Sequence, residues 1–141
     1  MSVSKERDEQ VRRMVVELQL LQNTGELLQT RLNVVESALA ELRISSATLE
    51  ELKKENTGSP LLVPLGGGTF VRASLGEVNT VIVGIGAEVS VEMELDKAVE
   101  DFGLRMSELE KVSLSLQQQL SQIAAQISSY QETLSRLSAQ A

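Results

Sequence analysis

The sequence contains no cysteine and no histidine. Disulfide bonds, thiolate metal sites and every catalytic relay that uses a thiol or an imidazole are therefore excluded, although carboxylate chemistry is not. Aromatic residues make up only 2% of the chain, and tryptophan is absent. Globular cores usually draw on more aromatic area than this, so the sequence favours an architecture that does not depend on a rounded core.

Long apolar runs and basic patches are also missing. No apolar run is long enough to cross a bilayer, and the opening residues 4–9 (SKERDE) are charged, so we expect no membrane span, no signal peptide and a cytoplasmic location. The net charge is −7, and the few basic residues are scattered. Because binding to phosphate needs a basic face, nucleic acid is not expected as a partner. Without an apolar run that could span a bilayer, a membrane is not expected as a partner either.

Two long segments carry apolar residues at alternating spacings of three and four, which is the heptad pattern of coiled coils. Helices of this kind bury one narrow stripe and leave little interior for an active site. We therefore expect a protein that holds, spaces or clamps something. The first seam comprises Val11, Met14, Leu18, Leu21, Gly25, Leu28, Leu32, Val35, Leu39, Leu42, Ser46 and Leu49. The second comprises Leu95, Val99, Phe102, Met106, Leu109, Ser113, Leu116, Leu120, Ile123, Ile127, Tyr130, Leu134 and Leu137.

Local signals give the helix boundaries. The first helix is predicted from near Ser4, its N-cap, to near Asn56, and Pro60 prevents its continuation. The second is predicted to begin at Asp96, also as an N-cap, and to run to the C-terminus. A compact insert separates the helices, so they can pair antiparallel. In the two registers considered, Gly25 faces Ile123 or Tyr130, Ser46 faces Phe102 or Leu109, and Ser113 faces Val35 or Leu42.

Between the helices the apolar period changes to two. Residues 89–95 alternate between apolar and polar, which predicts a strand with one buried face, and glycines mark turns. Residues 62–71 (LVPLGGGTFV) reappear twenty positions later as residues 82–91 (IVGIGAEVSV). Each copy has the pattern of strand, glycine turn and strand, so we predict two β-hairpins.

Two hairpins cannot close a stable core by themselves, because their apolar faces and strand edges would be exposed to water. We expect hairpins from several chains to form a shared sheet or barrel. The predicted fold is mainly α with a small β part: a long antiparallel coiled-coil hairpin whose two helices are joined by two β-hairpins that form an oligomeric β-barrel platform. Its predicted parts are residues 1–57 (first coiled-coil helix), 58–95 (hairpins, the assembly platform) and 96–141 (second coiled-coil helix).

The remaining patterns point to no chemistry. The glycine clusters at residues 66–68 and 84–86 precede strands, and they lack the lysine and the following helix of a phosphate-binding loop. Acidic residues alternate along residues 88–96, but nothing supplies the loop ligands of a calcium site. We therefore expect no catalytic residue, no metal, no cofactor and no enzyme activity.

Some apolar residues near the chain ends lie off the heptad seam, namely Val15, Val16 and Leu20. In the antiparallel arrangement Leu134 and Leu137 would lie near them. These residues either expose a small apolar surface or complete the coiled coil, and the sequence leaves both alternatives open.

The middle segment resembles a known family. Residues 62–70 (LVPLGGGTF) resemble the LVPxGxGxF signature of the prefoldin α subunit, and residues 81–86 (VIVGIG) resemble that family's second hairpin, VxVGxG. The resemblance covers the whole chain, and two hairpins distinguish α from β subunits, which carry one. The composition looks like the archaeal α subunit. Gly67 stands where the family often has alanine, a difference that should only loosen a turn.

The resemblance implies an ATP-independent chaperone subunit in a hexamer of two α and four β subunits. Such a hexamer captures unfolded proteins at its coiled-coil ends and transfers them to a group II chaperonin. The residues implied for binding unfolded protein are Val11, Met14, Val15, Val16, Leu18, Leu134 and Leu137. Those implied for the oligomer interface are Leu62, Val63, Leu65, Phe70, Val71, Ile82, Val83, Ile85, Val89 and Val91.

Two other functions stay open at this point. A prefoldin-like structural scaffold or filament protein that assembles with itself would use the same two hairpins. An enzyme that depends on Glu92 or Glu94 is a more distant alternative.

Overall fold

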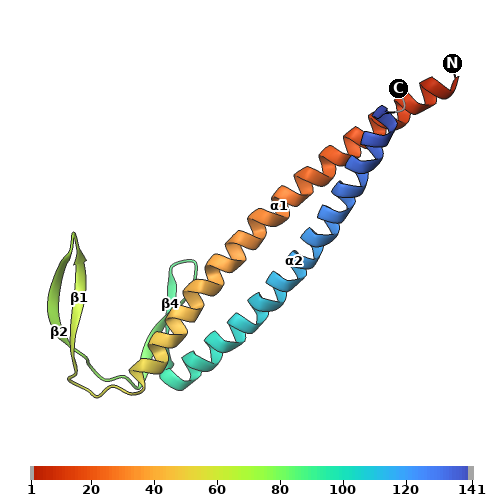
Figure 1. Ribbon diagram of the computed structural model, residues 1–141. Helices are drawn as coiled ribbons and strands as arrows, with labels where there is room; N and C mark the ends of the chain where they lie inside the picture. The colour runs from red at the N-terminus through yellow and green to blue at the C-terminus, as the bar shows by residue number, and fades with distance from the viewer. Residues whose placement is uncertain (1, 140–141) are drawn as a thin grey trace. The chain divides into compact units, whose positions relative to one another are not determined.

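The computed structural model describes residues 2–139. Its elements follow one another as α1 (Ser2–Leu52), β1 (Pro60–Gly66), β2 (Thr69–Ser74), β3 (Thr80–Gly86), β4 (Val89–Glu94) and α2 (Leu95–Ala139), as Figure 1 shows. This order confirms the prediction of two long helices joined by two hairpins. The chain divides into two compact units, Met1–Ala38 with Leu109–Ala141, and Leu39–Glu108. No helix within residues 2–139 combines the length and apolarity that crossing a membrane requires.

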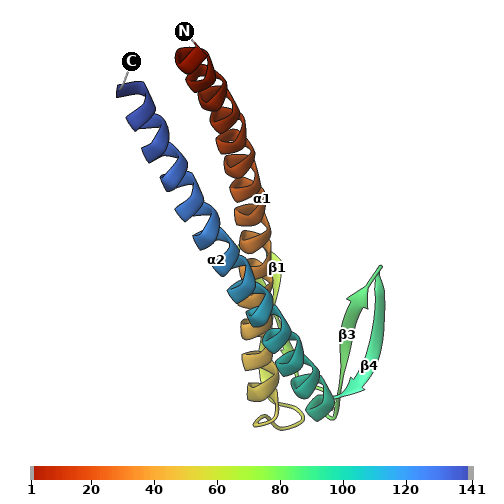
Figure 2. The same ribbon diagram turned by 90° about the vertical axis from the view of Figure 1, so that its right-hand side faces the viewer.

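The first unit is an antiparallel pair of helical segments. The beginning of α1 and the end of α2 lie at the same end of this unit (Figure 2). Its core consists of apolar seam residues, as heptad spacing predicts. The buried members are Leu28, Leu32 and Leu116, and Val35, Leu120 and Ile123 pack against them.

The register of this helix pair follows from Gly25. A Cβ atom built on Gly25 would lie 3.5 Å from Cγ2 of Ile123. Of the two registers considered, the structure therefore has the one in which Gly25 faces Ile123. A small residue opposite a branched one keeps the layer filled without a clash.

The predicted helix ends are displaced by a few residues. Ser4 is not an N-cap, because α1 already begins at Ser2, and Asp96 is not one either, because α2 begins at Leu95. The backbone N–H of Leu95 donates to the carbonyl of Asn79 (3.0 Å), so the pairing of β3 with β4 continues directly into the first residue of α2. At its other end α1 stops at Leu52, where tighter bonds such as Lys54 N to Glu51 O (3.0 Å) close the last turn.

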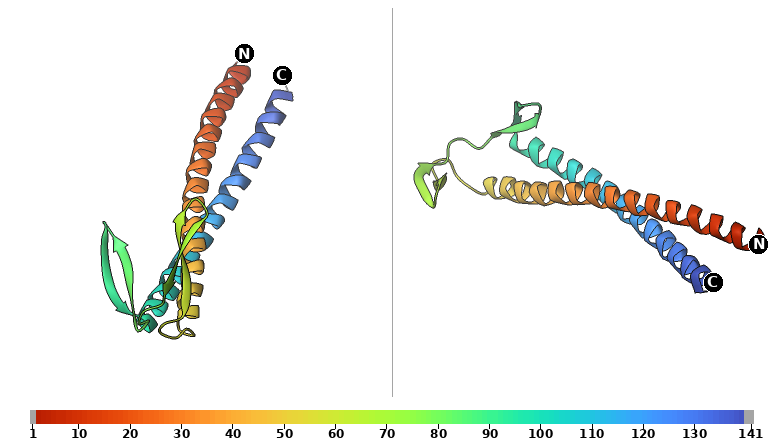
Figure 3. Two further views of the ribbon diagram at one scale, coloured as in Figure 1. Left: turned by 90° about the vertical axis from the view of Figure 1, so that its left-hand side faces the viewer. Right: turned by 90° about the horizontal axis from the view of Figure 1, so that it is seen from above.

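The hairpins are structural repeats. β1 pairs with β2 and β3 with β4, both antiparallel, as two separate sheets of two strands (Figure 3). Each hairpin has a two-residue turn, preceded by a register shift that lies between Pro64 and Gly66 in one and between Gly84 and Gly86 in the other. This equivalence confirms the internal repeat.

The two turns differ in chemistry. Gly67 and Gly68 occupy the first turn with φ of +58° and +76°, a region that glycine enters freely. Ala87 and Glu88 occupy the second turn with φ of +50° and +61°. Residues with a Cβ atom are destabilised in this left-handed region, so the second turn is the less favourable of the two.

Only the second hairpin packs into the core of its unit. Val83 is 6% exposed and clusters with Leu49, Leu95 and Ala98, while Val81 and Met93 pack around this cluster. Val63, the counterpart of Val83 in the first hairpin, is 38% exposed. Beside the core, Lys53 Nζ and Asp96 Oδ1 form an ion pair of 3.0 Å between the end of α1 and the start of α2.

Candidate functional site

The first hairpin exposes apolar side chains on both faces. Strand pairing sets Leu62 opposite Arg72, Val63 opposite Val71 and Pro64 opposite Phe70. Consecutive pairs point to opposite faces of a sheet, so both faces of this hairpin are apolar. Five of its large apolar side chains are exposed, at 61% for Leu62, 38% for Val63, 64% for Leu65, 56% for Phe70 and 46% for Val71, whereas Leu61 is half-buried.

The second hairpin also exposes apolar side chains, although one of its faces packs into the core. Ile82 is 79% exposed and pairs with Glu92, which accepts a hydrogen bond from Thr80 Oγ1 (3.0 Å). Ile85 and Val89 are also about half exposed. Of the residues predicted for assembly, Val83 is buried within its own unit and Val91, its strand partner, is half-buried. The other eight are exposed.

The predicted binding residues near the chain ends fall into two classes. Val15 and Val16 are 51% and 59% exposed. The other five lie on the heptad seam and are half-buried: Val11, Met14, Leu18, Leu134 and Leu137. All seven belong to the first unit, where this end of the helix pair presents both seam and off-seam apolar groups.

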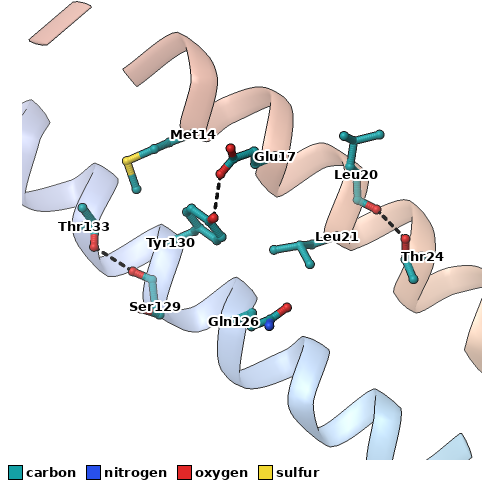
Figure 4. A pocket seen from close by; sticks show the side chains of 9 residues that line it. All are labelled: Met14, Glu17, Leu20, Leu21, Thr24, Gln126, Ser129, Tyr130 and Thr133. Atoms are coloured by element: carbon teal, nitrogen blue, oxygen red, sulfur yellow. Dashed lines mark hydrogen bonds between the residues drawn. The ribbon is translucent and has the colours of Figure 1, made fainter. Parts of the chain in front are cut away.

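A groove of about 510 Å³ lies beside these residues, between α1 and α2 within the first unit (Figure 4). Met14 is the one residue of the predicted binding set that lines it. Figure 4 shows Met14, Leu21 and Tyr130 directed into the space between the two helices. The complete lining is Met14, Glu17, Leu20, Leu21, Thr24, Gln126, Ser129, Tyr130 and Thr133.

One hydrogen bond joins the two helices at this groove. The hydroxyl of Tyr130 donates to Oε2 of Glu17 over 2.6 Å. This bond, reinforced by the negative charge of Glu17, raises the pKa of Tyr130. The phenol therefore keeps its proton at neutral pH. Glu17 is then the only charged side chain of the lining.

The local sequence pattern does not predict this pair. The heptad pattern places Tyr130 on the seam, but it assigns no role to Glu17. The antiparallel register is the feature from which this pair could have been predicted. The register that sets Gly25 against Ile123 also brings residue 130 opposite residues 17 and 18.

The groove has the composition of a binding surface. Its lining combines apolar groups, hydroxyls, an amide and a single carboxylate. Among residues 2–139 there is no group of three or more metal-ligating side chains close enough to hold an ion. The arrangement suits reversible binding of a partly apolar ligand.

Comparisons with known proteins agree on one family. The family model described as Prefoldin subunit matches residues 21–140. The chain is 34% identical over 116 residues to prefoldin subunit alpha of Methanopyrus kandleri, which covers 82% of this chain and 74% of that protein. It is 30% identical over 134 residues to prefoldin subunit alpha of Methanococcoides burtonii, covering 95% of this chain and 96% of that protein.

A solved structure supports the same relationship. The chain superposes on one from the cryo-EM structure of filamentous PFD from Methanocaldococcus jannaschii with a TM-score of 0.63 and 27% sequence identity. The match covers 86% of this chain and 95% of the other. Two long helices with two hairpins between them are thus a fold found in an experimental structure.

Proposed function

Because the chain belongs to the prefoldin family, as an alpha subunit of archaeal type, we propose that it captures unfolded proteins at the helix ends without ATP and transfers them to a group II chaperonin. The family membership confirms the resemblance found in the sequence. Prefoldin subunits are chaperones and not enzymes, which confirms the prediction of no enzyme activity. The capture of clients at the helix ends and their transfer to a chaperonin are our proposals.

The exposed apolar residues at the helix ends support capture there. Val15 and Val16 are more than half exposed, and five half-buried apolar residues lie near them. Each contact with an unfolded chain would be weak. Several such contacts on linked subunits act together through their effective concentration, and each can release without nucleotide. The acidic net charge of −7 limits self-association of a particle with exposed apolar groups.

The hairpins supply the surface for assembly in this proposal. Prefoldin subunits assemble with one another, and the first hairpin exposes apolar side chains on both faces. We propose that residues 58–95 form a platform with neighbouring subunits, in a cytoplasmic hexamer of two alpha and four beta subunits. Burial of these side chains in a shared barrel would remove their contact with water and would also pair the open strand edges.

Truncation of the helix ends tests the proposed capture site. Removing the residues before Leu18 and after Leu134 should leave the subunit composition of the complex unchanged. The truncated complex should suppress aggregation of a chemically unfolded client less well than the full complex does. Equal suppression by the two complexes would mean that clients bind elsewhere.

A homomeric scaffold or filament is the second candidate. The observation in its favour is the structural likeness to a prefoldin solved as a filament. Native mass spectrometry of the complex from source cells distinguishes the two. Two copies with four copies of a shorter coiled-coil chain support the chaperone hexamer, whereas a ladder of this chain alone supports the scaffold.

A further inference from the structure

We propose that the groove between α1 and α2, lined by Met14, Glu17, Leu21 and Tyr130 among others, binds a large apolar side chain of an unfolded protein that has a basic residue next to it. This inference rests on the proposed function and adds to it a sequence preference. It also moves part of the client-binding surface from the helix ends to the side of the helix pair.

The size and lining of the groove fit one side chain together with its backbone. The volume of about 510 Å³ lies in the lower half of the range for ligand sites. Met14, Leu21 and Tyr130 provide an apolar floor, as Figure 4 shows. Gln126 and Ser129 lie along the edge and can donate to, or accept from, peptide groups of an extended chain.

The charge of the groove gives the preference for a basic neighbour. Glu17 is its only charged group, and the hydrogen bond from Tyr130 fixes the position of the carboxylate. A carboxylate has two oxygens and several acceptor positions, so this bond leaves it able to accept from a lysine or an arginine. An acidic client segment would instead be repelled.

A second copy of this chain is a poorer occupant than a client. The chain carries a net charge of −7, so two copies repel one another around an acidic groove. A stable subunit interface buries roughly 800 Å² on each partner. The groove, with a volume of about 510 Å³, has the size of a small-ligand site and not of such an interface.

The experiment uses the assembled complex and fluorescent ten-residue peptides, with binding followed by fluorescence anisotropy. Each peptide carries a Leu-Phe pair flanked by arginines, by glutamates or by glycines. Thr24→Trp places a large ring in the groove, and Thr30→Trp is its matched control on the same helix. The match is close, because both threonine hydroxyls donate to the carbonyl four residues earlier, at 2.9 and 3.0 Å. Glu17→Gln removes the negative charge of the groove. Its control, Glu36→Gln, removes a negative charge that lies outside the groove lining.

Thr24→Trp should weaken binding of the arginine-flanked peptide about tenfold, as expected when one large apolar side chain loses its site, and Thr30→Trp should leave it within about twofold. The original complex binds the arginine-flanked peptide about threefold better than the glycine-flanked one, a typical effect of an exposed ion pair. Glu17→Gln abolishes that difference, and Glu36→Gln retains it.

Three results would overturn the proposal. They are equal binding by the two tryptophan variants, an arginine preference that survives Glu17→Gln, and a changed subunit number in Thr24→Trp, which would make the groove a subunit interface. Failure of the proposed function is recognised separately. In that case the original complex would not suppress aggregation of an unfolded client at all.

Discussion

The unequal packing of the two hairpins predicts unequal effects of one and the same substitution. Val83→Ala removes two methyl groups from a side chain that is 6% exposed and packs among Leu49, Leu95 and Ala98. At about 0.8 kcal/mol for each buried methyl, transfer alone accounts for about 1.6 kcal/mol. The cavity left behind raises the expected loss in unfolding free energy to about 2 kcal/mol.

Val63→Ala is the matched control for this prediction. Val63 occupies the equivalent position in the first hairpin and pairs with Val71 as Val83 pairs with Val91, but it is 38% exposed. In the isolated chain the substitution should therefore cost less than about 0.8 kcal/mol. In the assembled complex it should weaken association, because partners are expected to cover this side chain.

Urea unfolding followed by far-UV circular dichroism measures both variants of the isolated chain. The slope of the unfolding free energy against urea should stay constant, so that a shift in midpoint reports stability alone. Equal losses for Val63→Ala and Val83→Ala would refute the conclusion that only the second hairpin packs into the core of its unit.

Three further predictions concern single features of the structure. Phe70→Asp sets a charge on an exposed apolar face (Phe70 is 56% exposed), so circular dichroism should show an intact helix content while native mass spectrometry shows no complex. Ala87→Asn with Glu88→Gly relieves two left-handed residues and should stabilise the chain by about 1 kcal/mol, raising its Tm. An unchanged or lower Tm would contradict the conclusion that Ala87 and Glu88 strain the second turn. Tyr130→Phe removes the bond to Glu17. Because this bond raises the pKa of Tyr130 in the folded state, its stabilisation is complete below the pKa of a free tyrosine and is lost as the pH rises through the raised pKa. The difference in stability between the original chain and Tyr130→Phe should therefore disappear at strongly alkaline pH in thermal unfolding, and a difference that persists there would contradict this origin.

The sequence allowed the elements to be predicted and the helix register to be narrowed to a few alternatives, because both depend on periodicity. Heptad spacing predicted the seam, and the twenty-residue repeat predicted two equivalent hairpins. Antiparallel pairing of one seam class against the other left a few registers open. The structure has one of those registers, with Gly25 facing Ile123. Helix ends were less accurate. Cap-like residues such as Ser4 and Asp96 lie one or two positions inside the helices.

The packing of the hairpins and the groove could not be predicted in the same way. Both hairpins are apolar, so their sequences do not tell that Val83 is buried while Val63 is exposed. The Tyr130–Glu17 bond joins residues 113 positions apart, and it exists only in one register of the helix pair. Such contacts depend on which residues the tertiary structure brings together, and a single sequence does not contain that information in its local pattern.

The proposed function depends on the binding of unfolded clients at the helix ends. Site-specific photo-crosslinking tests it, with a photoreactive residue placed at Val16 or at Ile44 in the assembled complex. Both positions are exposed apolar sites on α1, at 59% and 69%, so they differ chiefly in their place along the helix. We expect an unfolded client to crosslink strongly from position 16 and weakly from position 44. Equal crosslinking from both positions, or stronger crosslinking from position 44, would contradict it.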